Sequence, residues 1–244
     1  MDRQGRHLGK TCGTLIMYWQ EDEQKPENPV IPDDVVDLVY SIQCRSLPVD
    51  HAHALYSAIA EVLPWLHEEE GAGVHPIHVA ESGNGWLRPE NADELLHLSR
   101  RTKLVIRVPK HRISEAEGLV GALLDVAGNE LSIDKVTQRL LSDLDTLFAR
   151  YMVIQNGMSE EEFLNQTITE MRELGVSPKK VLPGKGHVIR TPDGDLQTSS
   201  LMLADLKVDE SLILQQKGVG SHRHLGCGLF IPHKGIKEVY EKKD

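Results

Sequence analysis

Strand-like and helix-like segments follow one another in the same order twice along this chain, and this repetition limits the folds available to it. In the first half, β-branched residues in partial alternation indicate strands, and apolar residues at helical spacing indicate helices. The expected elements are a strand at Val35–Cys44, a helix from Asp50 to about Leu66, strands at Val74–Ala80 and Lys103–Val108, a helix at Ser114–Leu124 and a strand at Leu131–Val136. Asp50 is the expected N-cap of the first helix, and Pro64 should bend or end it.

The second half shows the same pattern with clearer helix and turn signals. Ser159–Glu162 fits a capping box, Gly175 should end the helix that this box opens, and Asp193-Gly194 is typical of a hairpin turn. The expected elements are a strand at Leu147–Ile154, a helix from Ser159 to about Leu174, strands near Lys179–Leu182, His187–Arg190 and Ser200–Leu206, a short helix at Asp209–Gln216 and a last strand at Cys227–Ile231.

Both halves therefore have the order β-α-β-β-α-β. The expected fold class is α+β, with two tandem ferredoxin-like (RRM-like) units of this order. We expect residues 1–34 to be a flexible N-terminal extension, because residues 20–34 are rich in Glu, Asp, Pro and Asn. Residues 35–140 should form the first unit, and residues 141–244 the second, which carries a glycine-rich stretch near its end.

The composition is that of a soluble globular protein, with 40% hydrophobic and 26% charged residues. No run approaches the roughly 18 uncharged apolar residues that a membrane span needs, and we find no export signal at the N-terminus. The three cysteines, Cys12, Cys44 and Cys227, are odd in number and widely spaced, which favours reduced thiols. We therefore expect a cytoplasmic protein with no membrane partner and no cofactor.

The net charge of −10 argues against nucleic acid as a partner if it is taken as an average, but the basic residues are clustered. Three groups contain little or no acid: Arg100, Arg101, Lys103, Arg107, Lys110 and Arg112; Lys179, Lys180, Lys185 and Arg190; and Lys217, Arg223 and Lys234. They favour a polarised surface that could bind phosphates. The alternative is that each group is an ordinary solvated strand edge or helix end.

The stretch Gly218–Phe230 carries glycines at positions 218, 220, 226 and 228 between a predicted helix and a predicted strand. Glycines there permit positive φ and let the backbone approach a bulky partner such as a phosphate. Arg223, flanked by His222 and His224, would add donors toward phosphate or a base edge. The pattern fits neither a Walker loop nor a dinucleotide-binding loop. The alternative is a tight loop that only leads into a strand.

Zinc binding is a further alternative for this region. His222, His224, Cys227 and His233 could supply ligands. However, His222 and His224 would point to opposite faces of an extended segment, and the paired cysteines of a typical structural zinc site are absent. We therefore expect no metal site.

The start of the first predicted helix holds a second group of candidate catalytic residues, His51, His53 and Tyr56. A histidine that titrates near neutral pH can take a proton from a ribose 2′-hydroxyl or return one to a leaving 5′-oxygen. His51 and His53 diverge by roughly 200° around a helix, so only one of them can face a shared site. Tyr56 lies one turn beyond His53 and could orient a reacting group. The alternative is that these side chains are ordinary surface or packing residues.

Together, these stretches resemble the CRISPR-associated repeat-processing endoribonucleases, the sixth Cas family, in the variant found with myxobacterial-type class 1 systems. The resemblance spans about residues 35–232. It is carried by Val36–Tyr40 leading into Leu47–Tyr56, by Gly73–Ile77 and Lys103–Pro109, and most specifically by Gly218–Phe230 with Pro232.

The resemblance implies a tandem ferredoxin-like fold and metal-independent cutting at the base of a CRISPR repeat stem, leaving a 2′,3′-cyclic phosphate and a 5′-hydroxyl. It also implies that the protein keeps its product RNA as a subunit of a class 1 (type I) interference complex with other Cas subunits. His51 stands at the motif position of the family's general base, and the glycine-rich loop is the RNA-contacting element. The RNA-binding residues expected from the resemblance and from the basic clusters are Lys217, Gly218, Gly220, His222, Arg223, His224, Gly226, Gly228, Arg100, Arg101, Lys103, Arg107 and Lys185.

Two alternatives to this hypothesis stay open on the sequence alone. The acidic average charge favours a non-catalytic subunit that only binds the 3′ hairpin of a guide RNA. A ferredoxin-like protein unrelated to this family is the other alternative.

Overall fold

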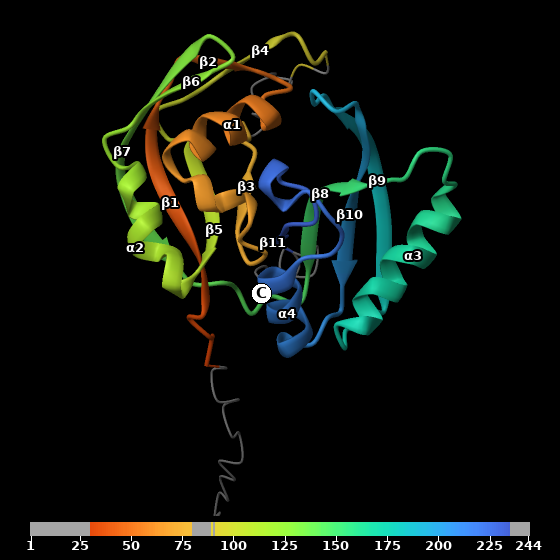
Figure 1. Cartoon of the computed structure of the whole chain (residues 1–244). Helices are drawn as coiled ribbons and strands as arrows, with labels where there is room; N and C mark the ends of the chain where they lie inside the picture. Colours follow the sequence, from red (N-terminus) through yellow and green to blue (C-terminus); the bar gives the residue numbers. More distant parts are fainter. Residues whose placement is uncertain (1–29, 80–88, 90, 235–244) are drawn as a thin grey trace, which may run out of the picture.

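Two antiparallel sheets, each with helices packed on one face, make up the protein (Figure 1). The computed structural model describes residues 30–79, 89 and 91–234. Residues 140–146 join the last strand of the first sheet to the first strand of the second, and most of the predicted extension 1–34 lies outside the described residues. Over the described ranges, no helix combines the length and the apolar run that a membrane crossing requires.

The first sheet has the strand order β3-β5-β1-β7-β6, and each neighbouring pair is antiparallel. Its strands are β1 (Val35–Gln43), β3 (Gly73–His75), β5 (Lys103–Pro109), β6 (Leu123–Val126) and β7 (Asn129–Arg139). Its helical segments are α1 (Ala52–Val62), η1 (Pro64–His67), η2 (Lys110–Arg112), α2 (Ile113–Ala116) and η3 (Glu117–Leu119). Two further short strands, β2 (Ser46–Pro48) and β4 (Leu95–His97), pair with each other.

The second sheet has the order β11-β8-β10-β9, again with antiparallel neighbours. Its strands are β8 (Leu147–Val153), β9 (Lys180–Ile189), β10 (Leu196–Ala204) and β11 (Phe230–Pro232), and its helices are α3 (Glu160–Glu173), α4 (Val208–Lys217) and η4 (Arg223–Leu225). In each unit the first strand lies between the third and the last. This arrangement confirms the predicted α+β, tandem ferredoxin-like fold.

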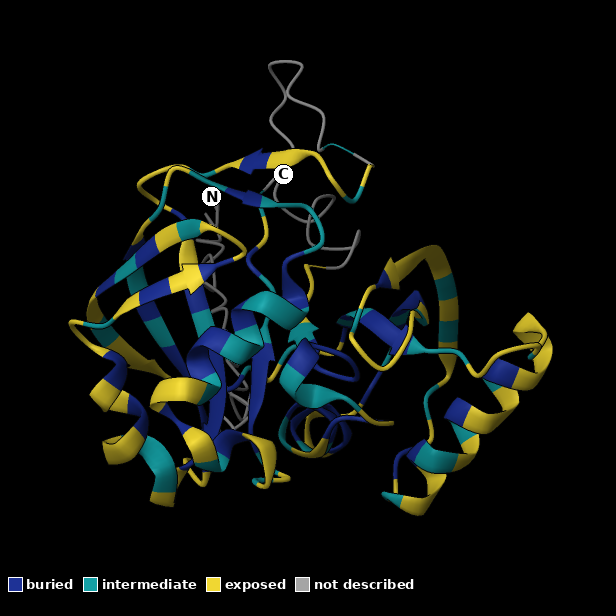
Figure 2. Ribbon diagram, turned by 45° about the horizontal axis from the view of Figure 1, so that its top comes forward, coloured by how far each residue is buried: buried dark blue, intermediate teal, exposed yellow. Residues whose placement is uncertain are grey.

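Alternation along β1 explains how the first unit forms its core. Val36, Leu38, Tyr40 and Ile42 are buried with the residues of α1, as expected when every second side chain of a strand points to the same face. β1 and β5 are buried along most of their length, whereas α3 of the second unit is exposed along much of its length (Figure 2). The opposite face of β1 holds Asp37, which is also buried.

Several local predictions hold in detail. The Ser159 side chain accepts a hydrogen bond from the Glu162 backbone and completes a capping box, and Gly175 follows α3 with φ +81°. α1 ends at Val62, directly before the Leu63–Pro64 step, so the predicted stop is confirmed.

Other predictions need correction. The expected strand Val74–Ala80 ends at Ala80, which lies outside the described residues; within residues 74–79 only Val74 and His75 are in a strand, β3. The expected helix Ser114–Leu124 is four residues of α-helix between two 3-10 turns. The two strands expected near Lys179–Leu182 and His187–Arg190 are one strand, β9.

The N-cap of α1 is His51 and not Asp50. The Asp50 carboxylate instead accepts a hydrogen bond of 3.1 Å from the backbone N–H of Arg190 in the second unit. Asp50 therefore contributes to the contact between the units and not to the helix cap.

The two units also share a buried cluster. Ala52 at the start of α1 packs with Tyr151, Ile189, Leu225 and Cys227 of the second unit. η4 accordingly lies against both β3 and α1, so the loop at the end of the second unit is seated on the first unit.

Candidate active site

Histidines and a tyrosine from both units meet where η4 lies against α1. The Tyr56 hydroxyl is 3.1 Å from Nδ1 of His67, and the Tyr56 ring centre is 4.5 Å from that of His224. The ring centres of His67 and His222 lie 5.7 and 5.9 Å from that of His224. We call Tyr56, His67, His222 and His224 the histidine cluster.

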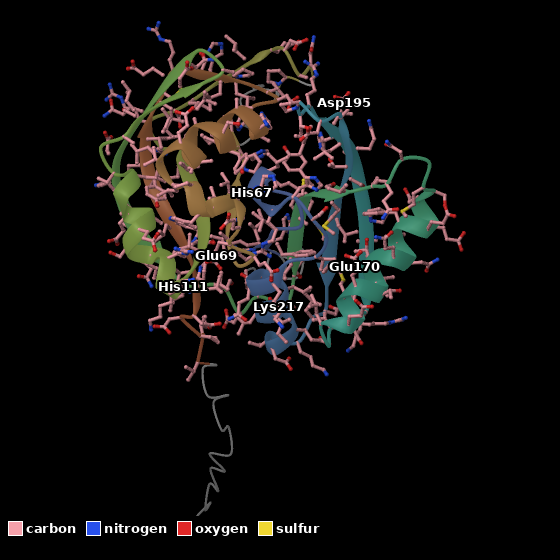
Figure 3. All side chains as sticks on the ribbon, viewed as in Figure 1. His67, Glu69, His111, Glu170, Asp195 and Lys217 are labelled. Atoms are coloured by element: carbon pink, nitrogen blue, oxygen red, sulfur yellow. The ribbon has the colours of Figure 1, made fainter. Side chains whose placement is uncertain are left out.

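Local chain geometry brings these side chains together. Tyr56 is on α1, and His67 ends the 3-10 turn that Pro64 opens just beyond that helix. His222 has φ +62° and turns the chain into η4, which Gly226 ends with φ +84°. Figure 3 shows His67 beside this C-terminal loop, with Lys217 at the end of α4.

The environment of His224 favours the neutral imidazole. Partial burial and the nearby His222, His67 and His53 lower its pKa to about 4, because both effects disfavour the charged form. Partial burial also raises the pKa of the Tyr56 hydroxyl, which therefore keeps its proton at neutral pH. His224 is thus unprotonated at neutral pH, and the Tyr56 hydroxyl holds the His67 ring in place.

His51, the expected general base, lies outside this cluster. It is 1% exposed, its Nδ1 is 2.8 Å from the Pro48 carbonyl, and its Nε2 accepts a hydrogen bond of 2.9 Å from the Ile77 N–H. With Nδ1–H donating and Nε2 accepting, both ring nitrogens are bonded within the chain. The structure thus gives His51 an anchoring position between two segments and leaves no exposed nitrogen for a bound RNA.

Three of the four glycines expected to approach RNA are buried: Gly218, Gly226 and Gly228. A Cβ on Gly226 would lie 2.2 Å from Pro76, and one on Gly228 would lie 2.0 Å from the Val219 carbonyl oxygen. These glycines are needed where the chain packs closely on itself. Their expected contact with RNA stays a prediction. Lys217 and Gly220 are exposed and stay available for RNA.

Arg107 and Arg223, also expected to bind RNA, use their guanidinium groups inside the protein. Arg107 is 0% exposed and donates to the Asp37 carboxylate at 2.8 Å. Arg223 donates to backbone carbonyls of both units, including Ala72 at 3.2 Å and Gln216 at 3.0 Å. Desolvation and the positive Arg107 lower the pKa of Arg223 to about 10, so it stays charged at neutral pH.

The remaining basic candidates are on the surface. Arg100, Arg101, Lys103 and Lys185 are exposed. An open groove of about 1040 Å³ lies at the end of β1, and its basic lining residues are Arg45, Arg100, Lys103 and Lys135. Glu130 and Asp134 also line it, so its charge is mixed.

The alternative zinc site finds no support in the geometry. Within residues 30–79, 89 and 91–234, no three histidine, cysteine or acidic side chains are placed to hold a metal ion together. Cys227 is fully buried in the cluster shared by the two units, and burial raises the pKa of its thiol to about 12. His222, His224, Cys227 and His233 are thus not gathered into one ligand set in the described structure.

His67 is not among the site residues predicted from the sequence. It follows the predicted end of the first helix and belongs to no motif, so nothing in the sequence placed it opposite a loop more than 150 residues away. The available signal was its place just beyond Pro64, where a short turn can bring a side chain back beside the helix.

Comparison with known proteins places the chain in a family. The family model described as Cas6 Crispr matches residues 36–235. This chain belongs to the Cas6 family. The CRISPR-associated endonuclease Cas6 of Myxococcus xanthus (strain DK1622) is 32% identical over 197 residues, which cover 81% of each chain.

Solved structures support the fold of this Cas6 chain. A CRISPR-associated Cas6 protein has a TM-score of 0.58 at 13% identity, covering 82% of this chain and 100% of its own. A Cas6-related protein of Pyrococcus furiosus has the same TM-score at 14% identity, covering 80% and 97%. At these identities, the likeness is one of fold alone.

Proposed function

We propose that this Cas6 chain is an endoribonuclease that cuts precursor CRISPR RNA within its repeats without a metal ion, and that it remains bound to the repeat hairpin in a class 1 (type I) interference complex. Family membership and the Myxococcus xanthus endonuclease support the RNA-processing role. The observation that carries the chemistry is the contact of Tyr56 with both His67 and His224.

The histidine cluster supplies both a proton acceptor and a proton donor for attack of a ribose 2′-hydroxyl on the adjacent phosphate. In the proposed step, neutral His224 takes the proton of the ribose 2′-hydroxyl, and the 2′-oxygen attacks the adjacent phosphorus. The bond from phosphorus to the 5′-oxygen breaks, and His67 delivers a proton to that oxygen. The products are a 2′,3′-cyclic phosphate and a 5′-hydroxyl, as the sequence resemblance implied.

Tyr56 and His53 have supporting places in this proposal. The Tyr56 hydroxyl can donate to a neutral Nδ1 of His67 or accept from a protonated one, so it orients the ring in both states. His53 is close enough to lower the pKa of His224 and stays a candidate at the margin of the site. We assign RNA contact to the exposed Lys217, Gly220, Arg100, Arg101, Lys103 and Lys185, and to the half-buried His222.

A cleavage assay tests this function. Purified protein in excess chelator, incubated with its cognate repeat RNA, should give one cut whose upstream product resists 3′-end ligation until its cyclic phosphate is removed. A product with a free 3′-hydroxyl would contradict the proposed mechanism, because internal attack by the 2′-oxygen cannot form it.

One observation favours a second candidate function. The net charge of −10 is unusual for a protein that must hold RNA by itself, and it fits a non-catalytic subunit that caps a guide RNA hairpin within a larger complex. Tight binding with RNA that stays intact for hours would favour this second function over the first.

A further inference from the structure

The C-terminal end of α4 is held by two arginines that come from different elements, β5 and η4. The last carbonyls of a helix have no partner within the helix. Arg107 on β5 donates from Nη1 to the Gln215 carbonyl at 2.7 Å and to the Phe230 carbonyl at 2.8 Å. Arg223 donates to the Gln216 carbonyl at 3.0 Å and to the Lys217 carbonyl. Three successive carbonyls at the end of α4 are therefore capped by two guanidinium groups.

Arg223 binds the first unit at the same time. Its Nε donates to the Ala72 carbonyl at 3.2 Å and its Nη2 to the Gly71 carbonyl at 3.3 Å. These carbonyls belong to the connection between η1, which ends at His67, and β3. A planar fork of five N–H donors can serve four carbonyls in this way, whereas an ammonium group on a flexible stem cannot.

The charge balance accounts for two arginines so close together. The Asp37 carboxylate binds Arg107 through Nε at 2.8 Å and binds Arg139 at 2.9 Å. The C-terminal end of α4 adds the partial negative charge of a helix terminus, which attracts cations. The positive charges of Arg107 and Arg223 are thus balanced by one carboxylate and by the backbone carbonyls at the end of α4.

The position of Arg223 in the chain ties this arrangement to the histidine cluster. It lies between His222 and His224, and its carbonyl partners in the first unit lie four and five residues beyond His67. Close packing also holds the C-terminal loop against the first unit, because a Cβ at Gly226 would clash with Pro76 and the carbonyl of Val74.

We propose that Arg223, with Arg107, is a positioning residue that fixes the C-terminal loop on the η1–β3 connection and so sets the distance of His224 from Tyr56 and His67. This inference rests on the proposed function only for its catalytic consequence. It also replaces the expectation that Arg223 binds RNA, because all of its donor nitrogens bond within the protein.

Two variants test this role, Arg223→Lys, which keeps the charge without the fork, and Arg223→Ala. A matched control is Arg172→Ala, which removes an exposed arginine in the last turn of α3, away from the histidine cluster. Repeat RNA affinity and the single-turnover cutting rate at saturating protein are measured separately. Displacement of a reacting group by about 1 Å can cost roughly 100-fold in rate, so we expect both Arg223 variants to cut roughly 10- to 100-fold more slowly, with affinity changed less than about 3-fold. The control should match the wild type.

A readout that does not depend on activity completes the test. NMR titration of the His224 imidazole should show its pKa rising from about 4 toward its ordinary value in Arg223→Lys, because the loop moves away from His67 and His53. An unchanged His224 titration in a folded Arg223→Lys protein would overturn the proposal, as would a loss of affinity with full cutting rate at saturation. If the wild-type protein does not cut RNA at all, the proposed function fails, and the titration still decides the role of Arg223.

Discussion

The ring of Tyr56 on α1 lies 4.5 Å from the ring of His224 in the C-terminal loop, so the candidate reacting groups come from both ferredoxin-like units. Neither unit alone contains the site. The contacts that seat the second unit on the first therefore matter for chemistry as well as for stability.

Tyr56→Phe isolates the hydroxyl of Tyr56 from its ring. The variant keeps the ring contact with His224 but removes the hydrogen bond that orients His67. We expect the single-turnover cutting rate to fall by roughly 10-fold and the affinity for repeat RNA to stay the same. Weaker binding at an unchanged saturated rate would show that the hydroxyl contacts RNA instead.

His51→Ala separates an anchoring role from a catalytic one. The variant leaves the Pro48 carbonyl and the Ile77 N–H without their partner in a buried region. Each buried polar group left unpaired costs about 1–3 kcal/mol, so the free energy of unfolding in urea should fall by at least that amount. Unchanged stability together with abolished cutting would return the general-base role to His51.

The stability of the protein should depend on pH because two histidines have lowered pKa values in the folded state. Burial lowers the pKa of His75 to about 3, and that of His224 is about 4. The unfolded chain binds protons on these groups near pH 6.5 and the folded chain does not. Stability is therefore full above about pH 6.5 and falls as the pH drops from there toward 4.

His75→Gln provides the measurement of this effect. Nε2 of His75 is buried and has no hydrogen-bond partner among the described residues. His75 takes up a proton in this pH range only in the unfolded chain, and glutamine takes up none. The variant should therefore lower the slope of the unfolding free energy against pH by about 1.4 kcal/mol per pH unit between pH 6 and 4.5. Urea unfolding series of the two proteins give the slopes, and identical slopes would contradict the depressed pKa of His75.

Two glycines of the loop allow a matched test of why the loop is rich in glycine. Gly226 and Gly220 both have positive φ, but a Cβ would clash with Pro76 only at Gly226. Backbone strain of about 1–3 kcal/mol applies to both alanine variants, and overpacking adds about 1–3 kcal/mol at Gly226. Urea unfolding should therefore show Gly226→Ala as clearly the less stable. Equal losses in the two variants would remove the packing argument.

Periodicity was enough to predict the fold, because in both β-α-β-β-α-β units the residues on the buried faces recur along the sequence with the period of a strand or a helix. The α3 capping box and the turn at Gly175 are equally local and were predicted in detail. The site was predicted only in part. Tyr56, His53, His222 and His224 were among the candidates. The roles of His51 and Arg223 depend on which backbone groups the fold places beside their side chains, and a linear pattern does not contain that information.

The most direct test of the central claim is the cutting rate of a variant that lacks both proposed proton-transfer groups, His67→Gln with His224→Gln. Single-turnover cutting of the cognate repeat is measured in excess chelator at saturating protein, with His233→Ala, an exposed histidine at the end of β11, as the control. Loss of proton transfer should slow the double variant by roughly 100- to 10,000-fold, with RNA affinity retained and the control unaffected. Cutting by the folded double variant at the wild-type rate would contradict the assignment of the active site to the histidine cluster.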